Sequence, residues 1–305
     1  MKKLLATGHK GFVGQAMASH LRASVQDHDV QWCSPQQSYD MCDVATVRAL
    51  LEEHRPDWVL HLAAQSHVPT AMNNPAATLL VNTVGTANLL QVLTDMQFKG
   101  RLLYVSSADV YGAVPAAMLP VSETWVPAPR NPYASSKLAA EMLCLQWARS
   151  YPLDVVIARP FNHTGAGQDI QFALPAFAKA VAEIAVGRHA PYIQTGDLDV
   201  TRDFSDVRDV VAAYLLLFRR GRSNEIYNVC SGREYRLSQV LDEIMRLAKV
   251  QADTARDPTR LRPAEQRRMC GDPGKITSET GWSPVYNFEE TLQQLLDQWL
   301  QEFQG

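Results

Sequence analysis

The feature that most restricts the fold of this chain is a glycine-rich loop that follows its first apolar run. Residues 3–7 are typical of a strand, and Gly8, Gly11 and Gly14 come next at spacings of three, with a helical pattern from Val13. Glycine adopts backbone angles closed to other residues and lets the backbone approach a pyrophosphate, while the start of a helix offers unpaired N–H groups. Strand, loop and helix in this order favour a dinucleotide-binding unit over an ordinary tight turn.

Short apolar runs alternate with longer amphipathic stretches from residue 3 to about residue 160. This alternation is the pattern of a parallel sheet with helices on both faces, so we expect an α/β fold with a Rossmann-type doubly wound parallel sheet. The predicted strands are 3–7, 30–33, 58–62, 101–106 and 155–158, and the predicted helices are 13–22, 44–54, 83–96 and 133–150.

The pattern loosens after Arg159. The predicted elements there are a turn-rich loop at 162–168, helices at 174–186, 207–218, 237–248 and 288–303, and strands at 192–195 and 225–229. We expect the nucleotide-binding domain to span 1–160, with parts of 196–231 rejoining it, and a smaller C-terminal α/β substrate-binding lobe to comprise 161–195 and 232–305. The Pro- and Arg-rich stretch 257–268 is typical of a surface loop that carries ligand contacts.

Composition excludes several classes of protein. With 305 residues, 46% hydrophobic and 20% charged, the chain has the make-up of a globular protein with a sizeable core. A net charge of -3 gives no broad positive field for nucleic acid or an anionic membrane, so an anionic ligand must be bound locally.

Cysteine usage and the N-terminus indicate where the protein works. Five scattered cysteines without a Cys-x-x-Cys pair predict neither a disulfide framework nor a metal site, and reduced thiols suit the cytoplasm. The charged N-terminus breaks at Gly8 before an apolar region forms, and we find no later unbroken apolar run of roughly 20 residues, so we expect a soluble cytoplasmic protein.

The strongest chemical signal is Tyr133-Ala-Ser-Ser-Lys137, which follows Ser106-Ser107 at the end of a predicted strand. Residues four apart share one face of a helix, so the phenol and the ammonium can enter one pocket. A free phenol titrates near ~10, and a nearby ammonium would lower its pKa toward neutrality. A serine hydroxyl would hydrogen-bond a substrate oxygen as charge develops on it. We assign that part to Ser107, with Ser106 as the fallback.

These motifs resemble the extended short-chain dehydrogenase/reductase family, in which the loop has the spacing G-x-x-G-x-x-G and the catalytic serine is aligned on the segment that here reads Val110-Tyr111-Gly112. The resemblance implies Ser107, Tyr133 and Lys137 as catalytic residues, NAD or NADP as the cofactor, and a homodimer. The cofactor contacts that it implies are Gly8, Gly11, Phe12, Val13, Gly14, Asp43, Leu62, Ala63, Ala64, Asn82, Tyr133, Lys137 and Pro160.

The preference between NAD and NADP stays open. The second strand ends at Cys33-Ser34 without the acidic residue that would hold the ribose hydroxyls, and no adjacent Arg or Lys would attract a 2'-phosphate. Asp43 matches the family position that contacts adenine, although a helix N-cap explains it equally well. Asn82 resembles the asparagine that ties neighbouring strands in this family, which is a structural role.

The residues after Ser107 separate reaction types. Sugar-nucleotide dehydratases of the family carry Thr-Asp-Glu at this point, where an acid and a base eliminate water. Here the run is Ser107-Ala108-Asp109, in which alanine transfers no proton and aspartate is one carbon shorter than glutamate. This disfavours a dehydratase and leaves a reductase or a 4-epimerase.

Later segments resemble the GDP-4-dehydro-6-deoxy-D-mannose reductases of this family. They are 159–165, 196–209, 227–232 and Arg262-Pro263, with Ala166 as a departure where proline is expected. The resemblance implies reduction of the C4 ketone to GDP-D-rhamnose, with Tyr133 as proton donor and with Arg202 and Arg262 clamping the diphosphate. The expected substrate contacts are Ser107, Asn162, Lys179, Arg202, Arg262 and Glu265.

Three alternatives remain beside this reductase. A nucleotide-sugar 4-epimerase would keep tightly bound NAD, and a reductase that attacks the other face would form GDP-6-deoxy-D-talose. A regulatory NAD(P)-binding protein without activity is the non-enzyme alternative, and the intact Ser107, Tyr133 and Lys137 argue against it. His163 receives no role, because a loop histidine with a structural hydrogen bond is at least as common as a catalytic one.

Overall fold

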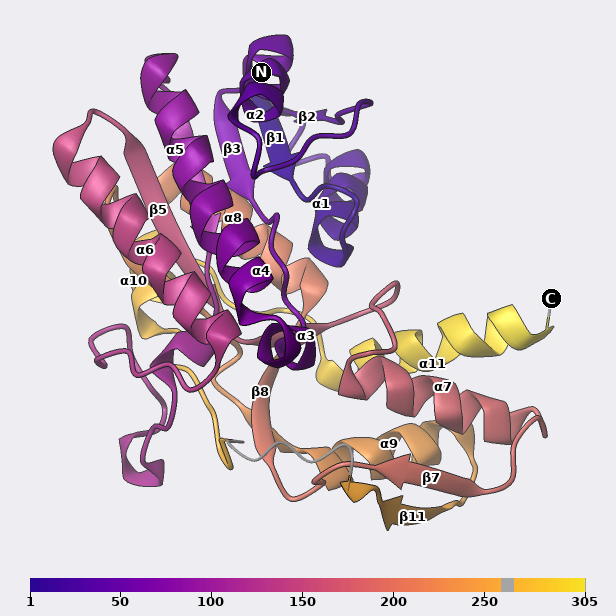
Figure 1. Ribbon diagram of the computed structural model, residues 1–305. Helices are drawn as coiled ribbons and strands as arrows, with labels where there is room; N and C mark the ends of the chain where they lie inside the picture. The colour runs from indigo at the N-terminus through magenta and orange to yellow at the C-terminus, as the bar shows by residue number, and fades with distance from the viewer. Residues whose placement is uncertain (259–265, 305) are drawn as a thin grey trace.

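The computed structural model describes residues 1–258 and 266–304, and a six-stranded parallel sheet forms its centre (Figure 1). In spatial order the strands are β2 (Val30–Cys33), β1 (Lys2–Thr7), β3 (Trp58–His61), β4 (Arg101–Val105), β5 (Asp154–Pro160) and β9 (Ile226–Val229). The predicted Rossmann-type doubly wound sheet is therefore confirmed, and each predicted strand of the first half agrees with an observed strand to within two residues at either end.

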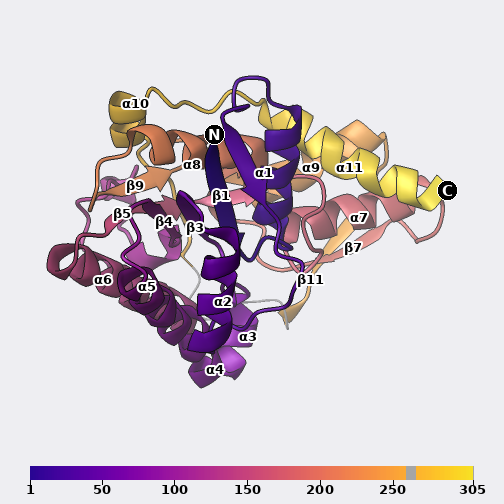
Figure 2. The same cartoon turned by 90° about the horizontal axis from the view of Figure 1, so that it is seen from above.

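The sheet is apolar on both faces, which is why helices cover both. Along β1, Leu4 and Ala6 pack on one face and Leu5 on the other, and in β4 Leu103 and Leu102 repeat this division. Buried parallel strands of this kind require a helical layer on each side. Figure 2 shows α1 (Phe12–Ala23) and α8 (Val207–Arg220) on one face, and α2 (Val44–His54), α5 (Gly85–Asp95) and α6 (Pro132–Ser150) on the other.

The helical stretch before β4 is longer than predicted. It begins with α3 (Val68–Asn73) and α4 (Pro75–Leu79), passes through a π-helical turn, η1 (Leu80–Val84), and continues as α5. Asn74 caps α4 by accepting a hydrogen bond from the Ala77 backbone N–H, and Pro75 occupies the first helical position. Asn-Pro is a helix-start signal that the sequence analysis did not use.

One helical stretch of the described residues, Pro75–Asp95, is long and apolar enough to span a membrane, whereas the sequence analysis found no such segment. Of the apolar window, 44% is buried inside the protein, where the stretch packs against α2 and α6. A core helix passes the same test of length and composition, so this finding is weak evidence for a membrane span.

Most of the rest of the chain lies beyond the carboxyl ends of the sheet strands (Figure 1). Strands β6 (Asn162–Thr164), β8 (Thr201–Asp206) and β10 (Glu234–Arg236) form a three-stranded sheet, and β7 (Tyr192–Thr195) pairs with β11 (Asp253–Arg256). Helices α7 (Ala173–Ala185), α9 (Leu237–Ala248) and α11 (Phe288–Gln304) share an apolar core, and α10 (Gly274–Thr280) packs against α8.

Most of these later elements agree with the predicted ones, but five were missed or mistaken. The predicted loop at 162–168 begins with the strand β6, and β8, β10, β11 and α10 were not predicted. The missed strands are short and polar, and β8 buries Asp203, Ser205 and Asp206, so no apolar alternation marks them. The division into a nucleotide-binding domain and a substrate-binding lobe stays a prediction. Of the predicted loop 257–268, residues 259–265 lie outside the described residues.

Asp206 joins the two parts of the fold. Its carboxylate, buried at the end of β8, caps α8 by accepting from the Arg208 backbone N–H at 2.8 Å. It also pairs with the Arg208 guanidinium and accepts the Thr291 hydroxyl of α11 at 2.7 Å.

We expect Asp206→Ala to lower the free energy of unfolding by about 2–4 kcal/mol, because a helix cap and buried charge-assisted hydrogen bonds are lost together. Urea unfolding followed by circular dichroism measures the change. The matched control is Asp199→Ala, an exposed aspartate of the same region, with an expected change within about 0.5 kcal/mol. Equal losses in the two variants would contradict this account of Asp206.

Candidate active site

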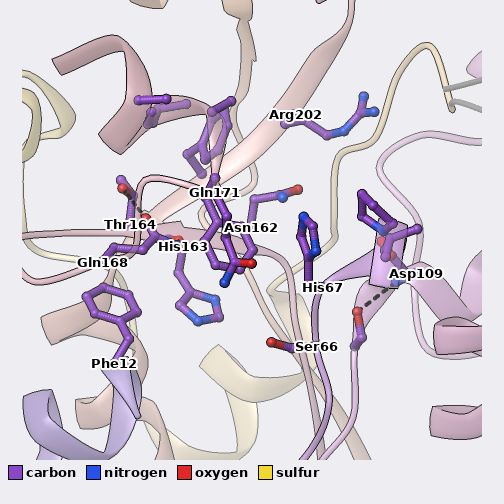
Figure 3. Close-up of a pocket in the computed structure, with 18 of the residues that line it drawn as sticks. Phe12, Ser66, His67, Asp109, Asn162, His163, Thr164, Gln168, Gln171 and Arg202 are labelled. Carbon is purple, nitrogen blue, oxygen red and sulfur yellow. Dashed lines mark hydrogen bonds between the residues drawn. The ribbon is translucent and has the colours of Figure 1, made fainter. Parts of the chain in front are cut away.

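The carboxyl ends of four neighbouring strands, β1, β3, β4 and β5, open into one cavity of about 1580 Å³ that continues between the later elements (Figure 3). The chain runs from β1 to β2 on one side and from β3 to β4 on the other, so the connections leaving β1 and β3 diverge at this edge. Ligands of doubly wound sheets bind at such a switch point.

The glycine loop fits a dinucleotide phosphate. Gly8 has φ +75°, and a Cβ on it would lie 2.9 Å from the Ala63 backbone nitrogen; a Cβ on Gly14 would lie 2.6 Å from the His9 carbonyl oxygen. These contacts leave no room for side chains, so the loop lies close against the residues after β3. The N-cap of α1, Gly11, has no capping side chain, which leaves the first N–H groups of this helix available to an anion.

Most of the predicted cofactor residues line this cavity. Those that do are Gly8, Gly11, Phe12, Val13, Gly14, Leu62, Ala63, Ala64, Tyr133, Lys137 and Pro160.

Two predicted cofactor residues are not among its lining residues. Asp43 caps α2 by accepting from the Ala45 backbone N–H at 2.9 Å. Asn82, which is buried, bonds both backbone groups of Gln65 and the Ser136 hydroxyl, and so ties the loop after β3 to α6. These bonds are structural, and a cofactor contact of either residue stays a prediction.

The three predicted catalytic side chains meet in the cavity. Ser107 follows β4, accepts from the Asp109 backbone N–H at 3.1 Å, and lies close enough to the Tyr133 phenol to lower its pKa. The Ser106 hydroxyl is buried and has no hydrogen-bond partner in the described part of the chain. The geometry therefore favours Ser107 over the fallback Ser106 as the partner of the tyrosine.

The pKa of Tyr133 differs from the expectation that Lys137 lowers it. Burial raises the pKa of the phenol and the Asp109 carboxylate raises it further, while the Ser107 hydroxyl opposes both. The sequence could not show how deeply the tyrosine is buried. At neutral pH the phenol keeps its proton, as a proton donor must.

Lys137 is also buried, and its contacts set its charge. Burial lowers its pKa to about 8, and the Glu141 carboxylate one turn further along α6 opposes that change. Its Nζ donates to the Val105 carbonyl oxygen at 2.7 Å and lies 5.1 Å from the centre of the Tyr104 ring. The ammonium is therefore present below about pH 8 and is lost above it.

Besides Ser107, three of the predicted substrate contacts, Asn162, Lys179 and Arg202, line the cavity. Arg202 donates to the Thr201 carbonyl oxygen at 2.7 Å, and Lys179 pairs with Glu183 at 3.6 Å.

The other two, Arg262 and Glu265, lie outside the described residues, as does Pro263 of the same motif. The roles of all five in substrate binding stay predictions. His163, which was given no role, bonds the Phe161 carbonyl oxygen at 3.0 Å and stacks on Phe12 with ring centres 6.2 Å apart.

Among the cavity residues that sequence reasoning missed are Ser66 and His67, and Asp109 was given no part. Ser66 and His67 follow β3, and Figure 3 shows His67 between Asn162 and Asp109 in this view. Both residues come shortly after β3, whose carboxyl end lies beside the glycine loop. That position in the sequence was the signal that could have identified them. Asp109 was noted only as a shortened glutamate, yet its charge acts on Tyr133.

This chain is similar to known proteins in sequence and in structure. A model of the family described as GDP-mannose 4,6 dehydratase matches residues 5–295. A GDP-6-deoxy-D-mannose reductase of Pseudomonas aeruginosa is 42% identical over 98% of this chain and 97% of its own. A GDP-6-deoxy-D-talose 4-dehydrogenase of Aggregatibacter actinomycetemcomitans is 32% identical over 92% of this chain and 91% of its own.

Two solved structures extend the comparison. The structure of RMD from Pseudomonas aeruginosa complexed with NADPH has a TM-score of 0.94 and 41% identity, covering 99% of this chain and 100% of that one. The UDP-glucose 4-epimerase of Thermus thermophilus in complex with NAD has a TM-score of 0.85 and 27% identity, covering 97% and 98%.

Proposed function

Because this chain belongs to the GDP-mannose 4,6-dehydratase family of extended short-chain dehydrogenases/reductases, we propose that it reduces the C4 ketone of GDP-4-dehydro-6-deoxy-D-mannose to GDP-D-rhamnose. It is an NAD(P)-dependent oxidoreductase, and NADPH or NADH is the reductant. GDP-D-rhamnose is GDP-6-deoxy-D-mannose, the compound in the name of the relative at 42% identity. The observation that carries the proposal is the meeting of Ser107, Tyr133 and Lys137 in one cavity beside the glycine loop.

The mechanism follows from these contacts. A reduced nicotinamide cofactor held by the glycine loop and Lys137 would supply a hydride to C4 of the sugar. Tyr133 donates its phenolic proton to the former ketone oxygen, and the Ser107 hydroxyl hydrogen-bonds that oxygen as negative charge develops on it. Lys137 keeps a positive charge close to the phenolate that remains. The products are the alcohol, the oxidised nicotinamide and a deprotonated Tyr133, which regains a proton from solvent.

The same site does not suit the dehydration in the family's description. Ala108 occupies the place of the acid and has no proton to transfer. Asp109 lies close enough to Tyr133 for its charge to raise the phenol's pKa, which keeps the proton on the tyrosine until a ketone accepts it. A protonated phenol suits reduction of a 4-ketone that another enzyme has already formed.

A second product deserves a test, because the talose 4-dehydrogenase is 32% identical over most of this chain. GDP-6-deoxy-D-talose differs from GDP-D-rhamnose in configuration at C4 alone, so the same residues serve either product. The face of the ketone that meets the hydride decides between them.

We expect mixing of the protein with GDP-4-dehydro-6-deoxy-D-mannose and NADPH or NADH to oxidise the nicotinamide, because both the proton donor and the cofactor cradle are present. Nicotinamide absorbance follows turnover, and NMR of the product gives the configuration at C4. GDP-D-rhamnose as the product would confirm the proposal. GDP-6-deoxy-D-talose would keep the mechanism and change the proposed configuration at C4. The absence of oxidation with either cofactor would refute the substrate, and NAD retained through purification would favour the epimerase.

Substitutions test the catalytic assignment. We expect Tyr133→Phe to lower kcat by about 10²–10⁴-fold through loss of the proton donor, and Ser107→Ala to lower it by about 10²-fold through loss of a hydrogen bond to the developing oxyanion. Ser106→Ala is the matched comparison, and a smaller loss is expected there. A larger loss in Ser106→Ala than in Ser107→Ala would reverse the assignment of the two serines.

We further propose that the protein is a cytoplasmic homodimer that pairs through α6 and the adjoining stretch of α4 and η1. Leu79, Leu80 and Val84 of that stretch and Met142 of α6 are 41–50% exposed, and the two elements pack side by side. A grouping of exposed large apolar side chains marks an interaction surface, and a twofold pair would cover it on both subunits. The five cysteines are unpaired, as expected of a reducing compartment.

We expect Val84→Glu to convert the dimer into a monomer, because it places a charge in the paired apolar surface. Light scattering after size-exclusion chromatography measures the mass. Val25→Glu is the control, since Val25 is 85% exposed before β2 and away from this surface. A wild-type monomer, or an unchanged mass in Val84→Glu, would contradict the proposed interface.

A further inference from the structure

A fully buried ion pair lies behind the catalytic residues. The Glu141 carboxylate on α6 accepts two hydrogen bonds from the Arg159 guanidinium on β5, at 2.9 Å from Nε and 2.6 Å from Nη2. Glu141 is 0% exposed and Arg159 is 2% exposed. Two parallel bonds between planar groups fix both side chains in orientation as well as in position.

Stability alone is a poor reason for such a pair. Removing two charges from water costs several kcal/mol for each ion, and apolar residues of similar volume often replace a buried pair without loss of stability. The buried pair, with its desolvation cost, lies where α6 and β5 pack against each other beside the cavity. A contribution to the chemistry is therefore the better explanation.

The pair lies in line with the catalytic residues. Tyr133, Lys137 and Glu141 are spaced by four residues along α6, so they share one face of the helix. Arg159 directly precedes Pro160, which lines the cavity at the end of β5. We propose that Glu141 and Arg159 are a positioning pair: the Glu141 carboxylate supports the Lys137 ammonium, and Arg159 fixes that carboxylate in place through two hydrogen bonds. This rests on the proposed reductase function.

The surroundings of Lys137 leave this task to Glu141. The titratable groups that act on Lys137 or are acted on by it are Glu141 and Cys144 of α6, Tyr104 of β4 and His61 of β3, and Tyr133 lies one turn away on the same helix. Burial raises the pKa of Tyr133, Tyr104 and Cys144, so these three are neutral near pH 7.

His61 is neutral too, because burial and the charge of Lys137 lower its pKa to about 3. Glu141 is therefore the member of this set that brings a negative charge to the ammonium. Without that carboxylate, burial would act on Lys137 unopposed and release its proton at lower pH.

Arg159 also reaches the segment that carries Ser107. Its guanidinium lies 4.8 Å from the centre of the Tyr111 ring, and the Tyr111 hydroxyl donates to the Asn228 side chain on β9 at 2.6 Å. Ser107 caps the short 3₁₀ turn that ends at Tyr111. One arginine thus contacts both the residue that supports Lys137 and the turn that begins at the catalytic serine.

The test is Glu141→Gln, which keeps the shape of the side chain and removes its charge. The alkaline limb of the pH profile of kcat/KM is expected to move down by at least about one pH unit, because the neutral form of Lys137 is favoured. For a shift of one unit this amounts to a loss of about fivefold at pH 8, while at pH 6 the activity stays within about threefold of wild type. A merely structural role would lower the activity equally at all pH values.

Cofactor binding gives a second readout that needs no sugar substrate. Lys137 lines the cofactor end of the cavity, so the affinity for NADPH, titrated by fluorescence against pH, is expected to show the same downward shift in Glu141→Gln. If wild type fails to oxidise NADPH with the GDP-sugar, the reductase proposal fails while this titration still tests the pair. The matched control is Glu243→Gln, which removes the carboxylate of an exposed pair with Arg246 on α9 and is expected to shift neither profile.

A double variant keeps the test valid should Glu141→Gln not fold. Glu141→Leu with Arg159→Met removes both charges at similar volume, and it is expected to fold and to show an alkaline shift in the same direction but of smaller size, because the positive charge of Arg159 is removed with the negative charge of Glu141. Unchanged alkaline limbs in both variants would overturn the proposal. So would an activity loss of the same size at pH 6 and pH 8.

Discussion

A parallel strand that is apolar on both faces is stable only between two layers of helices, and this constraint determines where the chemistry of this protein lies. The helices occupy the faces, so the edge at which the strands end is where side chains can meet a ligand. The glycine loop, Ser107 and the residues after β3 follow strands of this sheet, and Pro160 ends one. The later elements close over the same edge and turn it into a cavity.

Two negative charges act on the catalytic residues of that cavity. Asp109 favours the protonated phenol of Tyr133, and Glu141 favours the protonated form of Lys137. Both acids therefore support the forms needed at the start of a reduction: a phenol that can donate and an ammonium beside it. The alanine between Ser107 and Asp109 leaves the family's elimination chemistry without its acid.

Local patterns were sufficient to predict the strands of the central sheet, most helices and the Tyr133 and Lys137 pairing, because each depends on residues close in sequence. The polar strand β8 could not be predicted in this way, since its buried aspartates are satisfied by backbone groups and hydroxyls from distant segments. The pKa of Tyr133 was expected in the wrong direction because burial is a property of the packed chain. Arg159 gave no sign of its partner, although Glu141 lies at helical spacing from Lys137.

Helix α6 serves two surroundings at once. Its inner face carries Tyr133, Lys137 and Glu141, and its outer face presents Met142 to solvent, where the proposed second subunit would pack. The hydrogen-bonded backbone of one helix connects these faces. A change in how the two subunits pack would therefore alter the position of Tyr133, the proton donor. Quaternary structure and catalytic rate would then be under selection through the same nineteen residues of α6, so a substitution that changes one would also affect the other.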